Sequence, residues 1–161
     1  MTNLDDLPQI ELNIEAGNWT VQIPDLSAVL LPSLLQCLKI LEKNPAQTVS
    51  VLLTSDAQMQ ALNKQFRQID RPTNVLSFAS DAFAGAPLGD LAFGFETCMR
   101  QAQQRDILLQ EHLSHLFVHG LLHLFGFDHD NPQQAKTMEQ METKILIRAG
   151  HIDPWAQEAS V

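Results

Sequence analysis

The chain has 161 residues, 45% hydrophobic and 18% charged, which suits one globular domain able to bury its own core. Its net charge of −9 argues against a general nucleic-acid-binding protein, because such proteins present a basic surface to phosphates. The charge is uneven, however. Residues 1–30 hold five acidic side chains and no Lys or Arg, whereas residues 61–105 hold five basic and four acidic ones, so a locally positive cleft is compatible with the sequence.

The N-terminal segment and the two cysteines indicate the compartment in which the protein is expected. The N-terminal segment is acidic and polar, unlike a secretory or transit leader, and no apolar run approaches the roughly 20 residues that span a bilayer. Cys37 and Cys98 form no CxxC pair, which favours unpaired thiols in a reducing compartment. We therefore expect a cytoplasmic protein without membrane association, folded as a single domain over residues 1–161.

Hydrophobic periodicity predicts the secondary structure in chain order. Alternation predicts a strand at 9–14, and a helical period follows over about 24–43. A β-branched strand at 48–53 leads to a helix capped by Thr54 or Ser55 and ending near Arg67. Strands at 73–78 and 90–95 flank a loop at about 80–88 that is rich in Ala, Gly and Pro. Helices are predicted at about 97–105, at about 108–125, and from 130–132 onward.

This order predicts an α+β fold, a small mixed β-sheet of about four strands covered by about five helices, with one βαβ crossover near residues 48–79. The apolar helix at 108–125 is expected to be buried on most sides. We expect the metal site described next to lie in a cleft on this buried helix.

Three histidines near the end of that helix have the spacing of a metal site. His119 and His123 are four residues apart and therefore share one helix face, while Gly126 can adopt the left-handed turn that lets His129 supply a third nitrogen. Three protein ligands and one open position are typical of catalytic zinc. The spacing equals that of the metzincin proteases, HExxHxxGxxH, but Gly120 replaces their glutamate base. Gly120 is better interpreted as a position of close packing against a strand.

Histidines at this spacing also occur without a metal. His112 and His115 lie on the same predicted helix, and His115, four residues before His119, could compete as a ligand. Only the trio of His119, His123 and His129 includes a ligand carried by a turn, so we predict that trio.

Two further stretches extend the pattern. Residues 62–78, with the sequence LNKQFRQIDRPTNVLSF, and residues 88–91, LGDL, precede the histidine motif. In this order and at these separations the three stretches resemble the YbeY family of bacterial rRNA maturation factors. That family carries LNxxYRxxDxPT(D/N)VLSFP, an LGDI-type strand and HGxLHLxGxDH. The resemblance covers about residues 48–150, with Phe66 in place of tyrosine and Ala79 in place of proline.

The resemblance implies a zinc-dependent, single-strand-specific endoribonuclease that acts on ribosomal RNA, notably in maturing the small-subunit 3′ end, and in ribosome quality control. It implies small-subunit ribosomal proteins and a ribosome-associated GTPase as partners. It places one Zn²⁺ on His119, His123 and His129, and the active-site arginine on Arg67.

The remaining residue chemistry leaves alternatives open. The guanidinium of Arg67 suits a phosphate, but an arginine at a helix end also complements the helix dipole. Asp128 could orient a histidine, accept a proton, or stabilise a turn. The group that attacks the phosphate is therefore open: a metal-activated hydroxide alone, the same with help from Asp128, or the 2′-hydroxyl of the RNA.

Two other functions remain compatible with the sequence. One is a zinc hydrolase of peptides, amides or small phosphoesters. The other is a non-enzymatic ribosome-assembly factor with a structural metal.

Overall fold

The computed structural model describes residues 7–81 and 86–156. Its strands are β1 (Gln9–Ile14), β2 (Thr48–Thr54), β3 (Val75–Ala79) and β4 (Gly89–Gly94). Its helices are α1 (Trp19–Gln22), α2 (Leu26–Ile40), α3 (Asp56–Arg67), α4 (Phe95–Arg105), α5 (Leu109–Leu124) and α6 (Pro132–Arg148). The predicted mixed α+β fold is confirmed, with the single-turn α1 as the unpredicted helix.

The predicted elements are found within a few residues of their expected bounds. Ser55 caps α3, because its hydroxyl accepts a hydrogen bond from the backbone N–H of Gln58. Cys37 and Cys98 are buried and unpaired. No helix among the described residues is long and apolar enough to cross a membrane. Part of the loop predicted at 80–88 lies outside the described residues.

The sheet has the strand order β1-β2-β4-β3, with β1, β2 and β4 parallel and β3 antiparallel at one edge. The predicted βαβ crossover near residues 48–79 is therefore wrong, since β3 runs opposite to β2 and pairs with β4 instead. The parallel crossover runs from β1 through α2 to β2.

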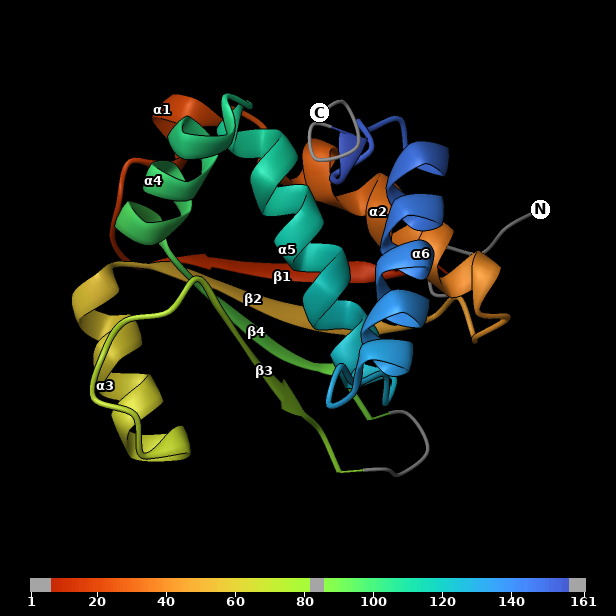
Figure 1. Cartoon of the computed structure of the whole chain (residues 1–161), viewed down its shortest axis with the longest axis horizontal. Coiled ribbons are helices and arrows are strands. Elements are labelled where there is room, and N and C mark those ends of the chain that lie inside the picture. The colour runs from red at the N-terminus through yellow and green to blue at the C-terminus, as the bar shows by residue number, and fades with distance from the viewer. Residues whose placement is uncertain (1–6, 82–85, 157–161) are drawn as a thin grey trace.

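The segment after α3 explains the reversal. Gln68 ends α3 in a left-handed conformation with φ of 57°. The following loop then folds back along the helix, where Asn63 Nδ2 donates to Arg71 O at 2.9 Å and Gln60 Nε2 donates to Asp70 Oδ1 at 3.0 Å. The chain consequently re-enters the sheet at the end where β2 left it, and β3 runs back along the edge (Figure 1).

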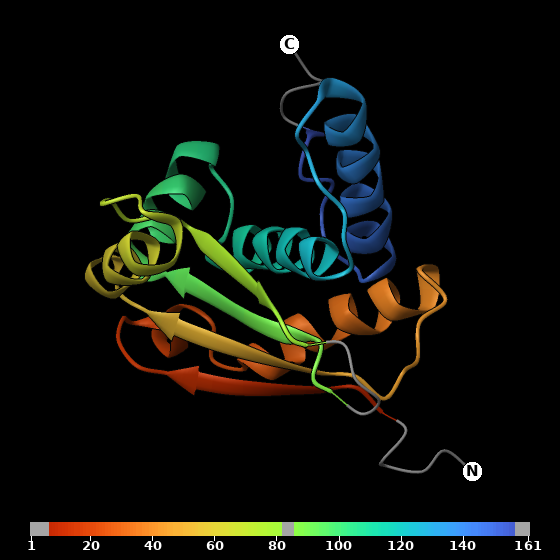
Figure 2. The ribbon, with the colours of Figure 1, turned by 90° about the horizontal axis from the view of Figure 1, so that it is seen from below.

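The two faces of the sheet are covered differently. Val49, Val51 and Leu53 alternate along β2 and face the main core, which α2, α5 and α6 close from one side. Figure 2 shows α5 and α6 on the same side of the sheet. On the other face Met59 of α3 packs with Leu76 and Ala92 in a smaller cluster.

Gly120 lets α5 approach the sheet closely. A Cβ at this position would lie 2.8 Å from Leu91 Cδ2, closer than side-chain atoms pack, and 3.3 Å from Ser77 Oγ, a tight contact. The predicted role of Gly120 in close packing is confirmed. This contact brings the last turns of α5 next to the edge strand β3.

Candidate metal centre

The end of α5 presents His119 and His123 one turn apart. Their Nε2 atoms lie 3.1 Å apart. One ligand nitrogen from each of His119, His123 and His129 lies within 4.8 Å of the other two. Two nitrogens bound to one zinc at tetrahedral geometry are about 3.3 Å apart, given the usual Zn–N length. The spacing of His119 and His123 therefore fits a bound ion, and the three histidines are positioned to hold one.

The outer nitrogens of two of these rings have fixed partners. His119 Nδ1 lies 2.9 Å from Glu142 Oε2, and an ionised carboxylate only accepts hydrogen bonds, so Nδ1 carries the proton. His123 Nδ1 lies 3.0 Å from the carbonyl oxygen of Phe127, and it too must donate. In each ring the Nε2 atom is therefore the one turned toward the shared point. Two imidazole nitrogens 3.1 Å apart, each oriented through the other nitrogen of its ring, are the donor set that imidazole-binding metals use.

The third histidine is positioned by the turn that ends α5. Gly126 has φ of +95°, its N–H donates to His123 O at 3.0 Å, and the N–H of Phe127 donates to Leu122 O at 2.9 Å. These two bonds form a Schellman motif, which closes a helix through a left-handed residue. The role predicted for Gly126 is confirmed, and the chain turns back so that His129 faces the helical pair.

Glu142 is a residue of the site that the sequence reasoning missed. It lies on α6, is 1% exposed, and accepts hydrogen bonds from His119 and from His115 Nε2 at 2.7 Å. Burial would raise the pKa of Glu142, but the hydrogen bonds from the two histidines outweigh it and hold the pKa below its usual range. A signal existed in the sequence, since this glutamate falls on the apolar face of α6 with Met138 and Ile145. His115 is thus engaged by Glu142 and is not part of the trio.

His123 is in the protonation state that a metal requires. Burial, and then the charges of His119 and His129, lower its pKa below the ordinary value for histidine. The ring is therefore neutral near pH 7, and only a neutral imidazole binds a metal.

Arg67 and the three histidines line one hollow, which Arg67 reaches from the other side of β3. It is the last residue of α3, and its Nη2 donates to Ser77 O at 2.9 Å while its guanidinium carbon lies 5.5 Å from the centre of the Phe78 ring. A hollow of about 550 Å³ is lined by Arg67 and by all three histidines. The structure thus brings the predicted arginine and the predicted ligands to one cavity.

Asp128 lies in the turn between Gly126 and His129. Its side chain is exposed, and its Oδ1 accepts the backbone N–H of His129 at 2.8 Å. This hydrogen bond is the main cause that lowers the pKa of Asp128. The contacts are those of a turn residue, one of the roles considered for Asp128.

Comparisons with known proteins agree with this geometry. The family described as Endoribonuclease YbeY matches residues 13–150. A protein named endoribonuclease YbeY from Bradyrhizobium diazoefficiens is 39% identical over 160 residues, covering 94% of this chain and 87% of that protein. Another of the same name, from Jannaschia sp., is 40% identical and covers 91% of this chain and 99% of the relative.

A solved structure has the same fold. The solution structure of TM1509 from Thermotoga maritima superposes with a TM-score of 0.53 at 19% identity, covering 90% of this chain and 97% of that one. The family match and the two relatives extend over most of the chain, well beyond the histidine motif. This chain therefore belongs to the YbeY family of endoribonucleases.

Proposed function

We propose that this protein is a zinc-dependent endoribonuclease that cuts single-stranded RNA, with one Zn²⁺ held by His119, His123 and His129. The observation that carries the proposal is the convergence of three imidazole nitrogens within 4.8 Å, two of them oriented through hydrogen bonds on the far side of their rings. Three protein ligands leave a coordination position for substrate or water. When bound, Zn²⁺ supplies Lewis acidity toward a phosphoryl oxygen and lowers the pKa of coordinated water.

Arg67 binds the phosphate that is cut. One of its five N–H donors is used by Ser77 O, and the contact with the Phe78 ring holds the guanidinium plane in place. Arg67 lines the hollow that the three histidines share, and Ser77 O is the one hydrogen-bond partner of its guanidinium among the described residues. A planar fork of fixed charge beside the metal ligands suits an anionic phosphodiester in its ground state and in its transition state.

The variant Asp128→Asn tests whether Asp128 acts as the general base in the attack on the phosphate. If Asp128 accepts the proton of the attacking group, Asp128→Asn lowers kcat by about 10²-fold or more, the usual contribution of a general base. If the aspartate acts only in the turn, the asparagine variant keeps the Asx contact and cuts RNA at the normal rate. Analysis of the product ends completes this test, because attack by the 2′-hydroxyl leaves a 2′,3′-cyclic phosphate.

The biological substrate follows from the family resemblance. We propose ribosomal RNA, notably the 3′ end of the small-subunit precursor, with a further role in ribosome quality control. The proposed partners are small-subunit ribosomal proteins and a ribosome-associated GTPase. The proposed location is the cytoplasm, and the proposed unit is a single domain over residues 1–161, with its motifs within about 48–150.

Cleavage of a small-subunit rRNA 3′ precursor tests the function. The purified zinc-loaded protein should cut it, while His123→Ala and Arg67→Ala should be inactive. Arg148→Ala serves as the matched control, because Arg148 is exposed at the end of α6 and does not line the hollow. Cleavage by Arg67→Ala at the normal rate would contradict the phosphate role, and equal cleavage by His123→Ala would contradict the metal assignment.

The alternative functions predict other results. A zinc hydrolase of another substrate class would leave RNA intact and turn over an amide or small phosphoester in a His123-dependent reaction. An assembly factor with a structural metal would lose its fold in His123→Ala, which thermal unfolding detects.

A further inference from the structure

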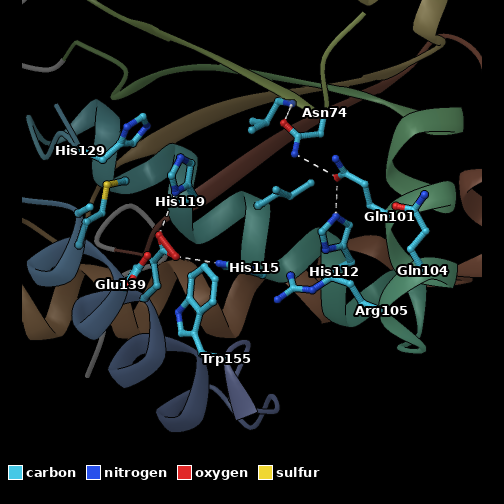
Figure 3. A pocket seen from close by; sticks show the side chains of 15 residues that line it. Asn74, Gln101, Gln104, Arg105, His112, His115, His119, His129, Glu139 and Trp155 are labelled. Atoms are coloured by element: carbon cyan, nitrogen blue, oxygen red, sulfur yellow. Dashed lines mark hydrogen bonds and ion pairs between the residues drawn. The ribbon is translucent and has the colours of Figure 1, made fainter. Parts of the chain in front are cut away.

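A second hollow adjoins the metal centre. It has a volume of about 560 Å³, within the usual range for small-ligand sites, and shares His119 and His129 with the hollow that contains Arg67 but does not include Arg67. Figure 3 shows these two histidines toward one end and Gln101 and Gln104 toward the other. Helix α5 forms the floor, and α4 and α6 supply the side walls.

A chain of hydrogen bonds fixes how Gln101 faces this hollow. The backbone N–H of Val75 donates to Asn74 Oδ1 at 2.7 Å, which identifies the other terminal atom of Asn74 as its nitrogen. That nitrogen donates to Gln101 Oε1 at 3.1 Å, and the same oxygen lies 2.8 Å from His112 Nε2 (Figure 3). The pKa of His112 is lowered to about 4, chiefly by burial, so its ring is neutral and donates through Nε2–H. Gln101 Oε1 is therefore saturated by two donors.

The amide nitrogen of Gln101, unlike its oxygen, is not engaged by this chain of hydrogen bonds. Among the described residues it has no hydrogen-bond partner, although Gln101 lines the hollow. Both of its N–H groups are thus available to a ligand, held in orientation by the chain that ends on His112. Gln104 adds a second exposed amide, and Trp155 adds apolar surface beside the buried side chains of Leu116 and Met138.

The amide end of the hollow holds one engaged arginine and, among the described residues that line it, no carboxylate. Glu139 and Glu142 lie toward the histidine end, where Glu142 is bound to His115 and His119 (Figure 3). At the amide end the Nη2 of Arg105 is bound to Pro154 O at 2.7 Å, and its guanidinium carbon lies 5.7 Å from the centre of the Trp155 ring. A flat, uncharged group with hydrogen-bond acceptors on its edge fits the amides and the apolar surface, and each of the four nucleobases carries such acceptors.

We propose that this hollow, named here the base pocket, binds the nucleobase of a nucleotide adjacent to the phosphate that is cut, and that the amide of Gln101 contacts its edge. The inference rests on the proposed function, which places that phosphate at the histidine trio. His112 and His119 are two helical turns apart, about 10 Å along α5. This distance is similar to that from a phosphate to the far edge of the base in the same nucleotide.

The test measures binding separately from cleavage. Zinc-loaded protein is titrated with a short single-stranded 2′-O-methyl RNA, and with copies in which one position at a time lacks its base. Because 2′-O-methylation blocks only attack by the 2′-hydroxyl, electrophoresis after each titration establishes that the RNA is intact. We expect one position at which removing the base weakens binding by about tenfold, the value of roughly one hydrogen bond to a well-placed amide. A base-to-abasic ratio below about twofold at every position would overturn the base pocket.

The decisive variant is Gln101→Glu. A glutamate keeps the oxygen that accepts from Asn74 and His112, but it turns an acceptor toward the hollow in place of the two donors. Its added negative charge weakens binding of the intact and the abasic RNA alike, so the ratio between them isolates the base contact. We expect that ratio to fall to about one in Gln101→Glu. An unchanged ratio in this variant would refute the role of the Gln101 amide.

Two more variants serve as checks. Gln104→Ala removes the second amide without touching the hydrogen-bond chain and should reduce the ratio partially. Gln103→Ala is the matched control on α4, since Gln103 is exposed and does not line the hollow, and it should keep the wild-type ratio. The two proposals fail differently: absent cleavage of the unmodified RNA with base-dependent binding retained contradicts the nuclease, whereas cleavage without base dependence contradicts the base pocket.

Discussion

Replacing Glu142 by glutamine tests how far the metal centre depends on a residue that cannot touch the ion. In the wild type both carboxylate oxygens accept, one from His119 Nδ1 at 2.9 Å and one from His115 Nε2 at 2.7 Å. A glutamine has only one acceptor oxygen. Its amide therefore turns N–H groups toward either His119 or His115. Toward His119 they force its proton onto Nε2, the atom proposed to bind the metal; toward His115 they force its proton onto Nδ1, a buried atom with no partner among the described residues.

The magnitude follows from the burial of this contact. Glu142 is 1% exposed, and a hydrogen bond to a charged group contributes about 1.5–3 kcal/mol. Losing one such bond corresponds to roughly a 10- to 100-fold weaker metal affinity, the usual effect of losing the outer partner of a ligating histidine. We expect the Kd of Glu142→Gln for Zn²⁺ to rise by that factor.

Competition with a chromogenic chelator measures the affinity, and circular dichroism establishes that the variant is folded. Glu139→Gln is the matched control one turn earlier on α6, where the side chain is exposed and makes no hydrogen bond with a ligand. A folded Glu142→Gln protein with the affinity of the wild type would refute the orienting role of Glu142.

Three further predictions concern stability. Burial, followed by the charges of His115 and Arg105, lowers the pKa of His112 to about 4. The stability that neutral His112 contributes is therefore complete above about pH 6.5 and is lost as the pH falls toward 4, so we expect the free energy of unfolding to be about 2 kcal/mol lower at pH 5 than at pH 7.5. Urea titrations at the two pH values should show a smaller loss for His112→Gln. Gly120→Ala adds a Cβ 2.8 Å from Leu91 Cδ2, an overpacking cost of about 1–3 kcal/mol that a gain of up to about 1 kcal/mol in helix propensity only partly offsets, so its urea midpoint should fall; a higher midpoint would contradict the close packing of α5. Free Zn²⁺ at about 100 times the Kd of the wild type should raise the free energy of unfolding by about 2.7 kcal/mol over chelator-treated protein. An equal gain in His129→Ala at the same free Zn²⁺ concentration would exclude His129 as a ligand.

The histidine trio was accessible from the sequence because its geometry is local. Two ligands are four residues apart on one helix, and a glycine turn carries the third, so helix periodicity and one left-handed residue fix all three. Glu142 was not accessible in the same way, since its contact with His119 depends on how α6 packs against α5. Its only local trace is a charged side chain on an apolar helix face.

Topology was the weaker part of the sequence reasoning. Residues 48–79 read as strand, helix and strand, and periodicity does not say whether the second strand runs with or against the first. The direction is decided by contacts of Asn63 and Gln60 with the loop after α3, which are polar side chains without a hydrophobic period. The hydrogen-bond chain from Asn74 through Gln101 to His112 is likewise invisible in sequence, because it joins three separate elements.

The three histidines are not held equally firmly, and this difference has a consequence for ion exchange. His119 and His123 are half-buried on a long helix, and both are held through their outer nitrogens, whereas His129 is exposed on the connection between α5 and α6. An ion held by the proposed trio would therefore be released first by His129, through opening of a short connection rather than unfolding of α5. Exchange of that ion would leave the core intact, and its rate would be the rate at which this connection opens.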